Sequence, residues 1–287
     1  MKEFLRLQRV PSFDLAQAPF PITQEFHRKY TLSPDYADPA HRAYISRALG
    51  RLVDIDRKLQ LLAFSALSQE GAIAAIQSFY RSRDRRSFAP DFVDLYYLYS
   101  HIRSHRPRTV LEFGSGASTA VMAHALARNG DGHLFALESS EAWAASTEAS
   151  LPSDLRPHAT IQYRPPVAAN VLGRSTYLFD APPVHTADMI YIDGAAHERA
   201  YFQGAENIES LDLRAGSFIY IDHRPNAVDY FKGKRTGALS GGQDGQCQYD
   251  VHSYMVVLAG FHRFHPSPFG ADRFSNTLVQ VSERPAP

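Results

Sequence analysis

The sequence has 287 residues, 44% of them hydrophobic, which is enough for one large packed domain or a domain with an extension. Lys plus Arg and Asp plus Glu number 30 each, so the formal net charge is zero and neither nucleic acid nor an anionic membrane is favoured as a partner. The single cysteine, Cys247, excludes an internal disulfide, no apolar run approaches the roughly 20 residues that cross a bilayer, and residues 1–9 mix charge and apolar side chains too finely for a secretory signal, so we expect a cytoplasmic protein.

Residues 1–88 are expected to form an N-terminal arm followed by a helical extension. Prolines interrupt the first forty residues, and apolar side chains then recur at helical spacing over 41–69 and 72–81, on the two sides of Gly71. The next helix is predicted over 90–107. An arm of this kind can pack on a second subunit, so the extension is also a candidate surface for a homodimer.

Residues 109–119 are the stretch around which the remaining chain is organised. A short β-rich apolar run is followed by Gly114 and Gly116, and then by Ser118 and Thr119, which suit the start of a helix. This pattern predicts a strand, a tight turn and a helix. The glycines allow a sharp turn and the close approach of a ligand, and the helix start offers unpaired N–H groups to a polar or anionic group.

Two nucleotide-like ligands suit such a turn. A dinucleotide site requires the pattern G-x-G-x-x-G, and here Thr119 stands at the third glycine position. An NAD(P)-dependent oxidoreductase therefore remains an alternative with an incomplete motif.

After the turn, predicted strands alternate with helices, which indicates a doubly wound, mostly parallel sheet of the α/β class. A long connection over 165–187 is expected to hold a short strand at 177–179. Five glycines within 232–247 predict a loop that acts as a lid. Two β-rich runs without a helix between them should pair antiparallel as the last strands. The predicted strands are 133–138, 159–163, 188–193 and 217–222, the last pair is 252–260 and 276–283, and a helix is expected over 197–211.

Three acidic residues, Glu138, Asp193 and Asp222, lie at the ends of predicted strands, where ligands bind in an open α/β sheet. Glu138 can accept both hydroxyl hydrogens of a ribose, in NAD as well as in other nucleosides. Asp193 and Asp222 are each followed by a histidine, His197 and His223. Carboxylates near an imidazole suit a general base and also a hard divalent ion such as Mg²⁺.

The pattern Glu112-x-Gly114-x-Gly116-x-Ser118-Thr119 resembles motif I of the class I S-adenosylmethionine-dependent methyltransferases, in which a third glycine is common where Ser118 stands. The resemblance implies a seven-stranded, Rossmann-like sheet over residues 89–287 and methyl transfer from S-adenosylmethionine to an oxygen of a small molecule. It also implies that the turn carries the methionine end of the cofactor, while the acid orders the turn or contacts the amino group. The implied cofactor-binding residues are Glu112, Gly114, Ser115, Gly116, Ser118, Thr119, Glu138 and Asp193.

In this family the loop after the fourth parallel strand faces the transferable methyl group. The resemblance therefore makes His197 and Asp193 the candidate catalytic residues, and Asp222 and His223 the candidate substrate contacts. Cation-dependent catechol-type members place Asp-Asn where this chain has Asp222-His223, so Mg²⁺ is an alternative rather than the expected cofactor. A non-catalytic binding protein on the same fold is the other alternative.

Overall fold

The computed structural model describes residues 61–81, 92–179, 182–193, 205–222, 227, 230–231, 247–253 and 277–283. Several predicted features lie outside these residues: the N-terminal arm, the candidate residues His197 and His223, and the glycine-rich loop up to residue 246. The division of the chain at residue 88 stays a prediction.

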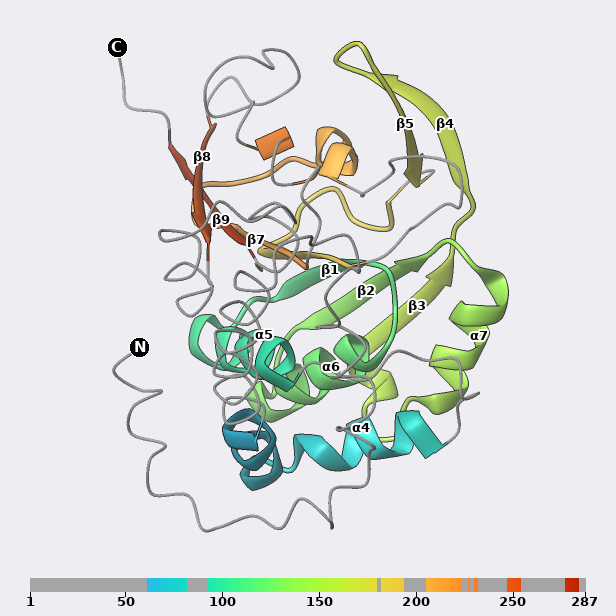
Figure 1. Ribbon diagram of the computed structural model, residues 1–287, viewed down its shortest axis with the longest axis vertical. Coiled ribbons are helices and arrows are strands. Elements are labelled where there is room, and N and C mark those ends of the chain that lie inside the picture. The colour runs from blue at the N-terminus through green and yellow to red at the C-terminus, as the bar shows by residue number, and fades with distance from the viewer. Residues whose placement is uncertain are drawn as a thin grey trace, which may run out of the picture.

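The fold is built on a seven-stranded sheet in the order β3-β2-β1-β6-β7-β9-β8 (Figure 1). The first five strands of that order are parallel, β9 is antiparallel to β7, and β8 is antiparallel to β9. The predicted fold class is therefore confirmed. The strands are β1 (Thr109–Phe113), β2 (His133–Glu138), β3 (Ala159–Tyr163), β6 (Met189–Ile192), β7 (Phe218–Ile221), β8 (Cys247–Ser253) and β9 (Thr277–Glu283).

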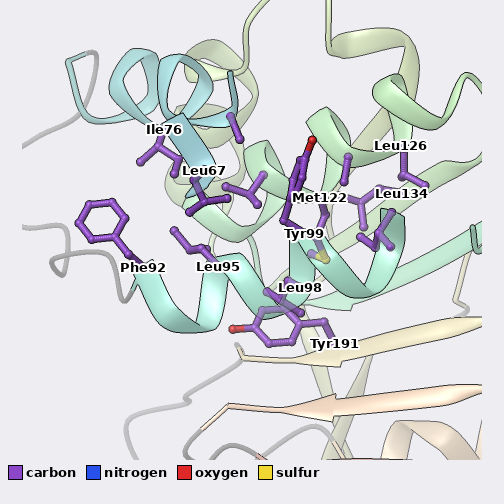
Figure 2. Packing of buried hydrophobic residues seen from close by; sticks show 14 of the residues in the cluster. Leu67, Ile76, Phe92, Leu95, Leu98, Tyr99, Met122, Leu126, Leu134 and Tyr191 are labelled. Atoms are coloured by element: carbon purple, nitrogen blue, oxygen red, sulfur yellow. The ribbon is translucent and has the colours of Figure 1, made fainter. Parts of the chain in front are cut away.

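One face of the sheet is covered by helices (Figure 1). A helical segment over 61–69 is followed by Gly71, whose φ of 81° marks the predicted break. Alternate residues of β1, β2 and β6 point to this face, and Tyr191 of β6 lies beneath Leu98 of α5 (Figure 2). The helices that follow are α4 (Ala72–Arg81), α5 (Phe92–His105), α6 (Ala117–Asn129) and α7 (Glu141–Ser150), with a 3₁₀ turn η3 (Arg156–His158) after α7.

The other residues of the same strands form a second apolar cluster on the opposite face. This cluster includes Leu111 and Phe113 of β1, and it is covered by η4 (Ala205–Ser210) and by Tyr230 and Phe231. Burial on both faces explains why the central strands β6 and β7 consist wholly of apolar residues. A buried acid within this sheet, such as Glu112 of β1, therefore needs its own explanation.

The crossover from β3 to β6 contains a β-hairpin that the sequence only partly predicted. Strands β4 (Pro166–Val171) and β5 (Arg174–Phe179) pair antiparallel, so the predicted strand at 177–179 is part of a longer one. Leu172 and Gly173, with φ of 51° and 78°, form the two-residue turn between them. Strand β8 begins at Cys247, five residues before the run predicted from residue 252. Among the described helices, none is long and apolar enough to cross a membrane.

Candidate functional site

The glycine turn lies where the sequence placed it, between β1 and α6. Gly114 has φ of 119°, a left-handed conformation that favours glycine, and its N–H donates to Leu137 O of β2 at 2.8 Å. Helix α6 begins at Ala117, three residues later. The turn is therefore tied to the neighbouring strand and aims the start of α6 at the carboxyl edge of the sheet.

Glu112 is fully buried beneath this turn. Its Oε1 accepts from Ser118 Oγ at 2.5 Å, and its Oε2 accepts from Thr119 Oγ1 at 2.7 Å. Burial raises the pKa of Glu112 to about 8, although these two hydrogen bonds lower it, and the nearby carboxylates of Asp193 and Glu138 raise it further. These contacts connect Glu112 to the start of α6, which is what the first of the two implied roles, ordering of the turn, requires.

Thr119, at the position of the third dinucleotide glycine, connects the acid to the turn. Its Oγ1 accepts from the N–H of Gly116 at 2.8 Å while it donates to Glu112. The amide of the second glycine is thus already used within the protein. With threonine at position 119, the N–H of Gly116 donates to a side chain of the protein and is not free for a ligand.

Gly116 does not need to be a glycine for the sake of its own backbone or its packing. Its φ of 171° is an extended conformation, and a Cβ built on it would meet no other heavy atom within 4 Å. Space is therefore left above the turn, at the N-terminus of α6, where a side chain of almost any residue type would otherwise project.

Glu138 ends β2 beside the turn, as predicted, and is 6% exposed. Its Oε1 accepts from Ser140 N at 2.9 Å and from Ser139 Oγ at 3.3 Å, and its Oε2 accepts from Ser115 Oγ at 3.0 Å. Burial raises the pKa of Glu138, and these donors oppose that effect. Since its donors are neutral N–H and hydroxyl groups, Glu138 can exchange them for the hydroxyl groups of a ligand.

Two residues of α7 that the sequence did not single out also hold the turn. Trp143 Nε1–H donates to Ser115 O at 2.7 Å, and Thr147 Oγ1 lies 3.2 Å from Ser115 Oγ. They are four residues apart and so share one face of the helix. This spacing is the only sequence signal for their role, and it cannot be recognised before the position of α7 over the turn is known.

Asp193 and Asp222 follow the adjacent strands β6 and β7. Asp193 N donates to Phe113 O at 3.1 Å, and Asp222 N donates to Ile192 O at 3.0 Å, so both acids continue the register of the sheet. Both also act on buried Tyr191, whose pKa is raised well above its ordinary value first by burial and then by these carboxylates. The structure therefore brings together Glu112, Glu138, Asp193 and Asp222 along one edge.

Among the described residues, no group of three or more His, Cys, Asp or Glu side chains could hold a metal ion. His223 is not among them, so the metal alternative at Asp193 and Asp222 stays a prediction. The same holds for the catalytic role of His197 and the substrate role of His223.

The sheet order, the glycine turn with its buried acid, and Glu138 at the end of β2 together define a class I methyltransferase fold. Residues 111–231 match the family model described as a methyltransferase domain. The matched region is therefore similar to a methyltransferase domain, in agreement with the motif over residues 112–119. The matched region begins within β1 and ends at Phe231.

Solved structures similar to this chain include three methyltransferases. They are an O-methyltransferase from Bacillus cereus in complex with SAH (14% identity, 74% of this chain and 90% of that chain, TM-score 0.45), the O-methyltransferase TomG from Streptomyces achromogenes, involved in tomaymycin synthesis, in complex with SAM (16%, 79% and 98%, 0.46), and the SAH-bound methyltransferase PaMTH1 from Podospora anserina (15%, 74% and 88%, 0.44). Among curated proteins, no sequence matches significantly.

Proposed function

We propose that this protein is an S-adenosylmethionine-dependent methyltransferase that methylates an oxygen of a small-molecule acceptor. The observation that carries the proposal is the open position at Gly116. Its extended backbone would accept any residue and its missing side chain would clash with nothing, so the protein's own packing does not call for a glycine there. A ligand that approaches the backbone at the start of α6 requires a glycine there, because any side chain would occupy its space.

The charge around the turn favours a cationic ligand. The carboxyl groups of Glu138 and Asp193 both lie close enough to Glu112 to raise its pKa, so these two acids stand beside the turn. S-adenosylmethionine carries a sulfonium and an ammonium group, which such carboxylates stabilise. The pyrophosphate of NAD(P) is a dianion, and like charges in a partly buried site destabilise binding.

The backbone argues in the same direction. A dinucleotide pyrophosphate binds to free N–H groups at the turn. Here the amide of Gly116 already donates to Thr119, and the hydroxyl of Thr119 is held in turn by Glu112. The oxidoreductase alternative would have to break this connection, so we favour the methyltransferase.

The residues fit the cofactor as follows. The main chain of Gly114, Ser115 and Gly116 would carry its methionine end. Glu138 would accept the ribose hydroxyl groups, and Asp193 would contact its amino group or hold the acceptor. When bound, the cofactor supplies an activated methyl group on sulfur. The tasks left to the protein are to align the acceptor, to exclude water and to accept one proton.

A methyl acceptor that is a hydroxyl group needs a general base, because it must lose its proton near the moment of methyl transfer. We propose that His197 is this base. We propose that Asp222 and His223, which follow the next strand, contact the acceptor. The balanced charge of 30 basic and 30 acidic residues agrees with a small molecule rather than a nucleic acid.

The test is calorimetric binding of S-adenosylmethionine to the wild type and to Gly116→Val. The variant should keep the thermal stability of the wild type, because the added side chain projects into open space, and it should lose at least tenfold in affinity. Ala142→Val, which adds a similar branch on the exposed side of α7, should bind as the wild type does. Unchanged affinity in Gly116→Val would refute the assignment of the turn.

Turnover separates the enzyme from a binding protein. Transfer of a labelled methyl group to one member of a panel of phenols, catechols and carboxylic acids would support catalysis. Tight binding without transfer to any acceptor would favour the non-catalytic alternative. Fluorescence of NADH that is enhanced on mixing with the protein would favour the oxidoreductase.

A further inference from the structure

The hydroxyl group of Ser115 lies between two acceptors. Its Oγ is 3.0 Å from Glu138 Oε2 and 3.2 Å from Thr147 Oγ1. A serine hydroxyl has one hydrogen and can donate it to only one of these oxygens at a time. Both acceptors are buried, Thr147 at 1% exposure, so solvent does not readily replace either bond.

The backbone around this hydroxyl group is fixed. Trp143 holds the carbonyl of Ser115, and the amides of Gly114 and Gly116 donate to Leu137 O and Thr119 Oγ1. Three of the backbone groups that define the turn are therefore paired within the protein. The Ser115 hydroxyl can change its acceptor by rotation about one bond, without movement of the main chain.

The number of donors on Glu138 makes such a change necessary. A carboxylate has about four lone-pair sites, and Ser140 N, Ser139 Oγ and Ser115 Oγ already use three of those on Glu138. Two vicinal hydroxyl groups of a ligand would bring the total to five. At least one present donor must leave, and Ser115 is the one for which the structure shows a second acceptor.

We propose that Thr147 is a positioning residue for the cofactor: it accepts the Ser115 hydrogen when a ribose hydroxyl group takes its place on Glu138. In the free protein, the Ser115 hydroxyl occupies the position on Glu138 that a ligand hydroxyl group takes in the complex. It thereby keeps Glu138 hydrogen-bonded and oriented toward the ligand site. This inference rests on the proposed function, because it takes the ligand to be the ribose of S-adenosylmethionine.

The test is a double-mutant cycle on Ser115 and Thr147, measured by calorimetric titration with S-adenosylhomocysteine, which is stable and carries the same ribose. Thr147→Val keeps the shape of the side chain but removes the acceptor, so the half-buried Ser115 hydroxyl is left without a protein partner in the complex. We expect a loss of roughly tenfold in affinity. Thr147→Ser, which restores a hydroxyl group, should recover most of it.

Ser115→Ala distinguishes this role from a merely structural one. Without the Ser115 hydroxyl there is nothing for Thr147 to accept, so Thr147→Val should cost little in the Ser115→Ala background. Ser115→Ala alone should bind at least as tightly as the wild type, because a competitor for Glu138 is gone. That single variant keeps the inference testable even where Thr147→Val does not fold.

The outcomes separate the two proposals. If the wild type binds neither S-adenosylmethionine nor S-adenosylhomocysteine, the proposed function fails. If the wild type binds but Thr147→Val has the same affinity, or loses equally in both backgrounds, the role of Thr147 is overturned and the proposed function stands. Weaker binding by Ser115→Ala would also overturn it.

Discussion

The buried acid under the glycine turn gives the sharpest prediction. The pKa of Glu112 is raised to about 8 in the folded protein, and no nearby cation in the described part of the chain opposes this rise. In the unfolded chain the pKa returns to its ordinary value near 4.5. Between these two values the folded protein binds a proton on Glu112 that the unfolded chain releases. The free energy of unfolding must therefore fall as pH rises through this window, and it must level off above pH 8.

The magnitude follows from the two pKa values. Their difference corresponds to roughly 5 kcal/mol, with a slope of about 1.4 kcal/mol per pH unit in the middle of the window. A typical domain is stabilised by about 5–15 kcal/mol, so the effect is large. Glu112→Gln mimics the protonated acid and removes the titration.

The assay is urea unfolding from pH 5 to pH 9, followed by the fluorescence of the single tryptophan, Trp143, which contacts the turn. The variant and the wild type should be similar at pH 5, and the variant should be more stable by several kcal/mol at pH 8.5. Glu148→Gln, at an exposed position of α7, should run parallel to the wild type. Parallel curves for Glu112→Gln as well would mean that Glu112 is ionised throughout, which would refute the reasoning.

Four further predictions concern the same site. A cationic cofactor should lower the pKa of Glu112, so S-adenosylmethionine should bind more tightly at pH 8 than at pH 6 and release protons; a binding enthalpy that is the same in buffers of different ionisation enthalpy would contradict this. Thr119→Val should lower the free energy of unfolding by about 1–3 kcal/mol and weaken cofactor binding, whereas Thr119→Ser should do neither, as measured by urea unfolding and calorimetry. His197→Ala should reduce turnover by roughly 10²–10⁴ with cofactor affinity nearly intact; full activity would move the proton acceptor elsewhere. Activity that is lost in EDTA and restored by Mg²⁺ would favour a metal at Asp193 and Asp222, and we expect no such loss.

The sheet could be predicted because its signals are local. Each parallel strand is a run of four to six residues rich in apolar side chains. Strand β2 ends in Glu138, and an acid directly follows β6 and β7 at the carboxyl edge. The turn at Gly114 was equally clear, since a left-handed residue next to a helix start requires glycine. These features depend on few neighbours in the sequence.

The β4–β5 hairpin was only half predicted for a physical reason. Strand β4 is largely exposed, with Val167 at 51%, so it lacks the apolar alternation of a buried strand. Its turn has Leu172 rather than the asparagine or glycine that usually indicates a two-residue hairpin. Likewise, the contacts of Trp143 and Thr147 with Ser115 depend on how α7 packs, and no local pattern encodes that packing.

The order of the last two strands has a consequence for synthesis. Strand β9 is made after β8, yet it lies between β7 and β8, so β8 has no place in the sheet until β9 has formed. While the chain grows on the ribosome, β7 remains an open edge, and such edges invite pairing with other chains. Truncation before residue 277 would therefore remove two strands from the sheet rather than one.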